Sequence, residues 1–109
     1  MPRYARPSAT RAVEAAIETF GNRVRVAIIG YLGDHEAADV SEIAQEIQAS
    51  PATVHHHLRK LEDLGLVSTD PSEPAKRNGV KILYSRNAIE LRTLYEQLGR
   101  ASRLDPLQK

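Results

Sequence analysis

The sequence has no cysteine and no tryptophan, and only one methionine and five aromatic side chains (four Tyr, one Phe) among its 109 residues. Without cysteine the chain cannot form a disulfide, a thiolate nucleophile or a thiolate metal site. With so few aromatic rings, the core must consist mostly of Val, Ile, Leu and Ala. A core of this kind is small, and a partner subunit would add buried area.

Long hydrophobic runs are also missing. No apolar run approaches the roughly 20 residues that span a bilayer, and the N-terminus lacks the apolar centre of a signal peptide. The glycines are scattered rather than gathered in a phosphate-binding loop, and no Ser-His-Asp arrangement can be placed. We therefore expect one soluble, cytoplasmic domain that has no membrane partner, requires no cofactor and is not an enzyme.

The net charge is only +1, but the charges are segregated along the chain. Arg3, Arg6 and Arg11 make the N-terminal end basic, the stretch 34–46 is acidic, and the stretch 76–86 is basic again. A nearly neutral protein with segregated charge can still present one positive face to phosphate. The predicted organisation is a flexible basic arm over residues 1–9, one domain over 10–103 and a tail over 104–109.

Helical periodicity and capping residues predict three helices in the first half of the chain. Thr10 is a suitable N-cap for the first helix and Gly21 ends it. Asn22 can cap the second helix, which Gly33 stops. The third helix covers 40–47, with an apolar stripe formed by Ile43, Ala44 and Ile47.

A fourth helix follows after the short connection Gln48-Ala49. Ser50 is a strong N-cap, and Pro51 stands at the first helical position, where its missing N–H has no consequence. Gly65 is the C-terminal stop. The apolar stripe of this helix has steps of four and three residues: Val54, Leu58, Leu61 and Leu64.

The pattern then changes to that of a hairpin followed by a last helix. Strands are predicted over 66–69 and 80–84, separated by the loop 70–74 and by an Asn78-Gly79 turn. Asn87 can cap the final helix. The predicted fold class is therefore mostly α with a small β-hairpin: a winged helix-turn-helix in the order helix, helix, helix, turn, helix, hairpin, helix.

The fourth helix has a polar face opposite its apolar stripe. An α-helix fits the major groove of B-DNA, where residues near its N-terminus reach base edges. Short polar residues at its start permit close approach, and basic residues further along can meet phosphate. The hairpin adds cations for the DNA backbone. The predicted DNA-binding residues are Ser50, Pro51, Ala52, Thr53, His55, His56, Arg59, Lys60, Lys76, Arg77 and Lys81.

The run from Ser50 to Val67 resembles the recognition helix and its Gly-Leu-Val exit in ArsR-type winged-helix repressors. Val40 to Ala44 resembles the first motif helix of that family, and Gly79 to Tyr84 resembles the end of its wing. The resemblance covers about residues 12–100. It implies the fold, DNA binding and a dimer. We therefore expect a transcriptional regulator that acts as a repressor, and the two-fold symmetry of a homodimer predicts an inverted-repeat operator.

The first and last helices are the predicted dimer seam, because each carries an apolar stripe that a chain this small can hardly bury alone. The residues assigned to this seam are Val13, Ala16, Ile17, Phe20, Leu91, Leu94, Tyr95 and Leu98.

Other interpretations of the same features stay open. His55, His56 and His57 could bind a metal, although consecutive helical residues point about 100° apart, and we expect His57 to pack partly against the domain. The acidic run around His35, Glu36 and Asp39 could hold a cation or simply be solvated. The basic arm could enter the minor groove or be disordered. The whole domain could be a protein-interaction module or a metal-responsive repressor. The effector and the operator are not specified by these patterns.

Overall fold

The computed structural model describes residues 9–73, 76 and 79–104. Most of the predicted basic arm, with Arg3 and Arg6, lies outside the described residues, as does the tail beyond Leu104. Arg77 and Asn78 of the hairpin loop lie outside them as well.

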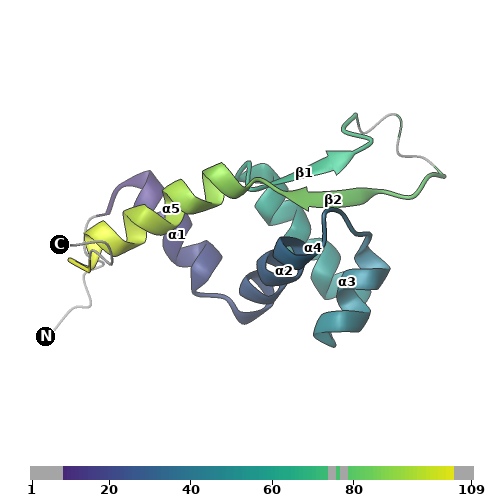
Figure 1. Cartoon of the computed structure of the whole chain (residues 1–109), viewed down its shortest axis with the longest axis horizontal. Coiled ribbons are helices and arrows are strands. Elements are labelled where there is room, and N and C mark those ends of the chain that lie inside the picture. The colour runs from purple at the N-terminus through teal and green to yellow at the C-terminus, as the bar shows by residue number, and fades with distance from the viewer. Residues whose placement is uncertain (1–8, 74–75, 77–78, 105–109) are drawn as a thin grey trace, which may run out of the picture.

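Five helices and one antiparallel hairpin make up the described part of the chain, in the predicted order (Figure 1). The elements are α1 (Arg11–Phe20), α2 (Arg23–Asp34), α3 (Val40–Ile47), α4 (Pro51–Asp63), β1 (Val67–Asp70), β2 (Leu83–Arg86) and α5 (Ala88–Ala101). No helix in the described part of the chain is long and apolar enough to cross a membrane.

The predicted N-caps of three helices are confirmed. The side chains of Thr10, Asn22 and Ser50 each accept a hydrogen bond from the backbone N–H three residues later. Each cap satisfies one of the N–H groups that a helix start leaves unpaired. The predicted stop at Gly65 is confirmed by its φ of +76°, a left-handed conformation that glycine adopts without steric cost.

One predicted helix end and one predicted cap differ from the structure. Helix α2 continues past Gly33 by one residue, to Asp34, and a Cβ at Gly33 would lie 2.8 Å from the guanidinium carbon of Arg86. Asn87 stands at the predicted start of α5 but makes no side-chain cap. Its amide instead donates to the Gly65 carbonyl (2.8 Å) and its oxygen accepts from the Ser68 hydroxyl (2.9 Å), which ties the hairpin to the end of α4.

The hairpin is shorter than expected at its second strand, which begins at Leu83 instead of at residue 80. The strands pair from Val67 opposite Arg86 to Asp70 opposite Leu83. Ala38, between α2 and α3, adds a bridge on the other side of β2. It exchanges two backbone hydrogen bonds with Tyr84, of 3.0 and 2.8 Å. The hairpin is thereby attached to the helices through its own backbone.

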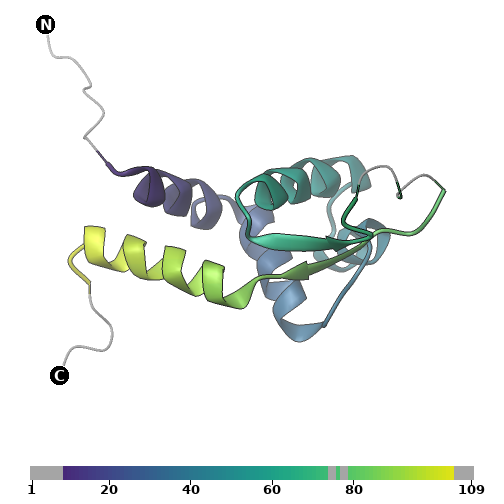
Figure 2. The same cartoon turned by 90° about the horizontal axis from the view of Figure 1, so that it is seen from above.

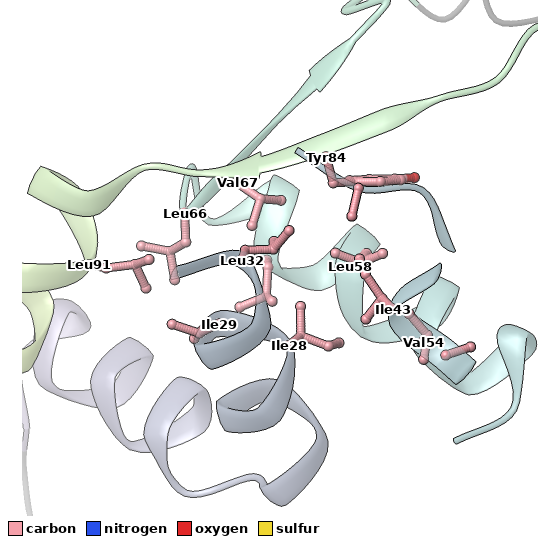
Figure 3. Packing of buried hydrophobic residues seen from close by; sticks show 13 residues of the cluster. Ile28, Ile29, Leu32, Ile43, Val54, Leu58, Leu66, Val67, Tyr84 and Leu91 are labelled. Carbon is pink, nitrogen blue, oxygen red and sulfur yellow. The ribbon is translucent and has the colours of Figure 1, made fainter. Parts of the chain in front are cut away.

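The main core lies between α2, α3, α4 and the base of the hairpin (Figure 3). The stripe predicted for α4 supplies Val54, Leu58 and Leu61, each fully buried, whereas Leu64 at the helix end is exposed. The other members of the cluster are Ile28, Ile29, Leu32, Ala38, Ile43, Ala44, Leu66, Val67, Tyr84 and Leu91. As expected from the composition, they are nearly all aliphatic.

Helices α1 and α5 lie side by side and extend away from this core (Figure 2). Only Ala16 and Thr19 of α1 and Leu91 of α5 are buried. Phe20 and Tyr95 meet edge to face, with ring centroids 5.6 Å apart. The pair thus forms an arm in which each helix covers only part of the other.

Candidate nucleic-acid interface

The exposed face of α4 gathers the residues that the sequence assigned to DNA. Every predicted position from Ser50 to Lys60 is exposed, while the stripe of Val54, Leu58 and Leu61 is buried beneath. A shallow recess on this face is lined by Ala52, His55, His56, Arg59, Lys60 and Asp63. One helix therefore offers small groups near its N-terminus, two imidazoles in its middle and two cations behind them.

The start of α4 is fixed by its own side chains. The Thr53 backbone N–H donates to the Ser50 hydroxyl at 3.1 Å, and that hydroxyl donates to the Thr53 hydroxyl at 2.8 Å. Both hydroxyls are exposed and keep further hydrogen-bonding capacity. The cap holds in place the first turn, which a base-reading helix presents to the groove.

His57 differs from its two neighbours, as predicted, because its ring is half-buried against the domain. Its Nδ1 accepts a hydrogen bond of 3.0 Å from Nε of Arg25 in α2. Burial, followed by the positive charge of Arg25 and the nearby His56, lowers the pKa of His57 from its ordinary 6.5. Arg25 also donates from Nη1 to the Glu18 carbonyl in α1 at 3.3 Å. No sequence signal could reveal this contact, since Arg25 and His57 are 32 residues apart.

The cations of the hairpin have partners within the chain. Nζ of Lys81 lies 3.1 Å from Oδ2 of Asp39, and Lys76 lies 3.5 Å from Glu73. The hydrogen bond and charge of Asp39 raise the pKa of Lys81. Both lysines remain exposed, so each can still approach phosphate. Arg77, the third predicted hairpin cation, lies outside the described residues.

Asp39 belongs to the acidic run that could hold a cation, but its role as a helix cap was missed, although the sequence holds the signal. Its side chain accepts from the Glu42 backbone N–H (2.8 Å), and the Glu42 carboxylate accepts from the Asp39 N–H (3.3 Å). This capping box starts α3, and the pattern Asp-x-x-Glu before an apolar stripe is its signature. The backbone hydrogen bond from Glu42, together with Lys81, lowers the pKa of Asp39.

The residues predicted to form a dimer seam divide into three groups. Ala16 and Leu91 are buried inside the chain, and Leu91 belongs to the main core cluster, so neither is on the monomer surface. Ile17 and Tyr95 are 49% and 57% exposed. The remaining four are half-buried: Val13, Phe20, Leu94 and Leu98. Ile89, which the sequence analysis overlooked, is 78% exposed on α5.

The histidine and acidic residues do not converge. Within the described ranges, no group of three His, Asp or Glu side chains is placed to hold a metal ion. His35 stacks on Tyr31 with ring centroids 4.0 Å apart, and its Nδ1 lies 3.0 Å from the Tyr31 carbonyl.

A helix-turn-helix formed by α3 and α4, followed by an antiparallel hairpin, defines the winged helix-turn-helix class. Residues 22–69 match the family described as bacterial regulatory protein, arsR family. The helix-turn-helix segment is therefore similar to the ArsR family, in agreement with the resemblance of the sequence motifs.

Known proteins agree with this assignment. An uncharacterised HTH-type transcriptional regulator of Methanocaldococcus jannaschii is 40% identical over 53 residues, which cover 49% of this chain and 55% of the relative. The chain thus spans about half the length of that relative.

Two solved structures share the fold at low sequence identity. The antimony-specific transcriptional repressor AntR is 21% identical with a TM-score of 0.61, over 92% of this chain and 89% of that one. An ArsR family transcriptional regulator is 18% identical with a TM-score of 0.63, over 90% and 94%. At these sequence identities the comparison shows a shared fold alone.

Proposed function

We propose that this protein is a sequence-specific transcriptional regulator that binds double-stranded DNA as a homodimer and represses the gene behind its operator. The observation that carries the proposal is the face of α4. Its N-terminal turn is capped and exposed, and His55, His56, Arg59 and Lys60 follow on the same side. The ArsR-family match over residues 22–69 supports the same assignment.

Base reading and phosphate binding are divided along α4. Thr53 and His56 lie in its first half, where a helix in the major groove reaches base edges. Arg59 and Lys60 lie in its second half, where a cation meets the DNA backbone. The hairpin brings Lys76 and Lys81 as further phosphate contacts, with Arg77 assigned to the same role from the sequence.

The homodimer is proposed to form through α1 and α5. These helices leave Ile17, Ile89 and Tyr95 at the surface, and a second copy of the same surface would cover them. A two-fold dimer places two α4 helices one DNA turn apart, roughly 34 Å or a multiple of it. The operator is therefore an imperfect inverted repeat, and occupying it excludes or redirects polymerase.

Control by divalent metal ions is not part of the proposal, because the chain has no cysteine and His55, His56 and His57 are spaced poorly for chelation. Titrating zinc, nickel, cobalt and copper into the protein–operator complex should change affinity by no more than a few-fold. Stoichiometric metal binding with release of DNA would contradict this.

The proposal is tested by selecting bound sequences from a random duplex pool and then measuring salt-dependent binding to selected and scrambled duplexes. His56→Ala should weaken the selected duplex by about tenfold, since a base contact contributes about 1–3 kcal/mol of discrimination, and leave the scrambled duplex nearly unchanged. Lys60→Ala should weaken binding to both duplexes and reduce the slope of log affinity against log salt concentration by about one unit.

Arg92→Ala is the matched control, because it removes an exposed cation from α5 instead of α4. It should leave both affinities and the salt slope unchanged. If no sequence is enriched, or if Arg92→Ala acts like Lys60→Ala, α4 is not the DNA-reading element.

A further inference from the structure

The run His55-His56-His57 is only partly explained by contact with DNA. His55 and His56 lie on the exposed face of α4, whereas His57 is half-buried and bonded to Arg25. Arg25 in turn is bonded to the Glu18 carbonyl at the end of α1. One side chain of α2 therefore connects the middle of α4 to the arm that we propose for dimerisation.

We propose that His57 is a titratable positioning residue: when neutral it holds α4 against α2 through Arg25, and its protonation releases α4 and weakens specific DNA binding in mild acid. This inference rests on the proposed function, because it assumes that α4 reads DNA.

The contact requires the neutral ring. Nε of Arg25 is always a donor, since the guanidinium stays protonated at any physiological pH. Nδ1 of His57 must therefore be the acceptor, which places the ring proton on Nε2. Protonation would put an N–H on Nδ1, facing the N–H of Arg25, and two positive charges would then be in contact. The hydrogen bond would be lost and a repulsion would replace it.

The surroundings of His57 lower its pKa below that of an ordinary histidine. Burial comes first among the causes that lower its pKa, followed by Arg25 from α2 and by His56 from α4 itself. In the described part of the chain, α3 and β1 also pack against α4, but no charged group of theirs is among the causes of this shift. From α1, Glu18 reaches the site through its carbonyl, which keeps the guanidinium in position.

The expected effect of a proton on His57 is opposite in sign to that of positive charge added on the exposed face of α4. Added charge on that face should strengthen binding to any duplex. Protonation of His57 moves the helix that reads bases. The affinity for the selected duplex should therefore fall, and the affinity for the scrambled duplex should not. The ratio of the two affinities removes the effect of charge that is common to all duplexes, and comparison of the wild type with a His57 variant isolates the contribution of His57.

Specific and scrambled binding should be measured from pH 7.5 to pH 5 for the wild type and three variants. His57→Asn places Oδ1 near the position of Nδ1 and accepts from Arg25 at every pH. For this variant the ratio of selected to scrambled affinity should not change with pH. For the wild type the ratio should fall by about threefold to tenfold, the change expected from the loss of one hydrogen bond. His55→Asn is the matched control and should fall like the wild type.

Arg25→Ala covers the case in which His57→Asn does not fold. Without the donor, the ratio should start low at pH 7.5 and show no step on acidification. The proposal is overturned if His57→Asn or Arg25→Ala keeps the pH step of the wild type, or if the wild type has none.

A second arm needs no DNA. In an NMR titration of the free protein, the His57 ring should titrate below the ordinary pKa of 6.5. The backbone amides around Arg25 and His57 should shift in step with it. If the chemical shifts of these amides do not change as His57 titrates, the proposed role of the contact between Arg25 and His57 is wrong. A wild type that binds no duplex at any pH would overturn the proposed function instead, while the ring titration would still decide the contact.

Discussion

The two ends of the molecule bury their apolar side chains to very different degrees. At one end α2, α3, α4 and the hairpin enclose a core in which Val54, Leu58 and Leu61 are fully buried. At the other end α1 and α5 bury only Ala16, Thr19 and Leu91 and leave Ile17, Ile89 and Tyr95 exposed.

This difference supports the separate tasks that we propose for the two ends. The first end, which we call the complete end, encloses its core within one chain and presents a polar face on α4, while Val26 and Leu64 are exposed at its surface. The second end, which we call the unfinished end, has its exposed large apolar groups along one helix pair. A second copy of the chain would complete it and would also set the distance between two α4 helices.

The largest expected effect lies in the complete end. Leu58→Ala should lower the free energy of unfolding by about 2–5 kcal/mol, because it leaves a cavity where α4 meets the core. Denaturant unfolding followed by circular dichroism measures it. Arg59→Ala, the exposed neighbour on the same helix, should stay within about 0.5 kcal/mol. Similar losses for the two variants would mean that α4 does not anchor the core.

The next effect separates the two ends. Tyr95→Asp should weaken the dimer by about 2 kcal/mol, the size expected for a buried aromatic anchor, yet leave the helical content of each chain intact. Sedimentation equilibrium across a concentration series measures the association. Thr93→Asp, an exposed polar position of α5, is the control and should dimerise like the wild type. If Tyr95→Asp associates like the wild type, this part of α5 does not belong to the dimer interface.

A smaller effect concerns the connection between the hairpin and α3. Asp39→Ala should lower the free energy of unfolding by about 1 kcal/mol, because it removes a helix cap and the partner of Lys81. Asp39→Asn keeps a capping oxygen but not the charge, so it should lose less. Urea unfolding at neutral pH compares the two variants.

The pH dependence of these variants follows from the pKa of Asp39, which lies below its ordinary 3.8 in the folded chain. Its charge therefore stabilises the fold fully above that value, and the contribution is lost as the pH falls through the folded pKa. The difference between wild type and Asp39→Asn should shrink in the same range. A difference that is constant down to pH 2 would contradict the assignment.

The smallest effect lies between α1 and its neighbours. The Thr19 side chain is fully buried, and its hydroxyl has no hydrogen-bond partner among the described residues. A buried polar group without a partner is costly. Thr19→Val keeps the shape and should raise the free energy of unfolding by up to about 1 kcal/mol, measured by thermal and urea denaturation. A clear loss of stability would show that the hydroxyl is bonded in solution.

Local signals explain most of what the sequence could predict. Thr10, Asn22 and Ser50 cap helices through bonds to residues three positions away, so each cap is visible as a short pattern. The polar and apolar faces of α4 follow from helical periodicity alone, and the family motifs lie on the same segment.

Features that depend on distant residues could not be predicted. Asn87 has the right chemistry for a cap but bonds to Gly65 and Ser68 instead. The bridge between Ala38 and Tyr84 involves a single residue between two helices, too short for any strand pattern. The partner of Lys81 likewise comes from another part of the chain. Each of these depends on how the helices pack, which local periodicity does not encode.

The central claim is that the unfinished end brings two copies of the chain together so that two α4 helices read one duplex. Sedimentation equilibrium of the wild type on its selected duplex, combined with hydroxyl-radical footprinting, tests it directly. The account predicts two chains per duplex and two protected half-sites one helical turn, or a multiple of it, apart. One chain per duplex with a single asymmetric footprint would contradict it.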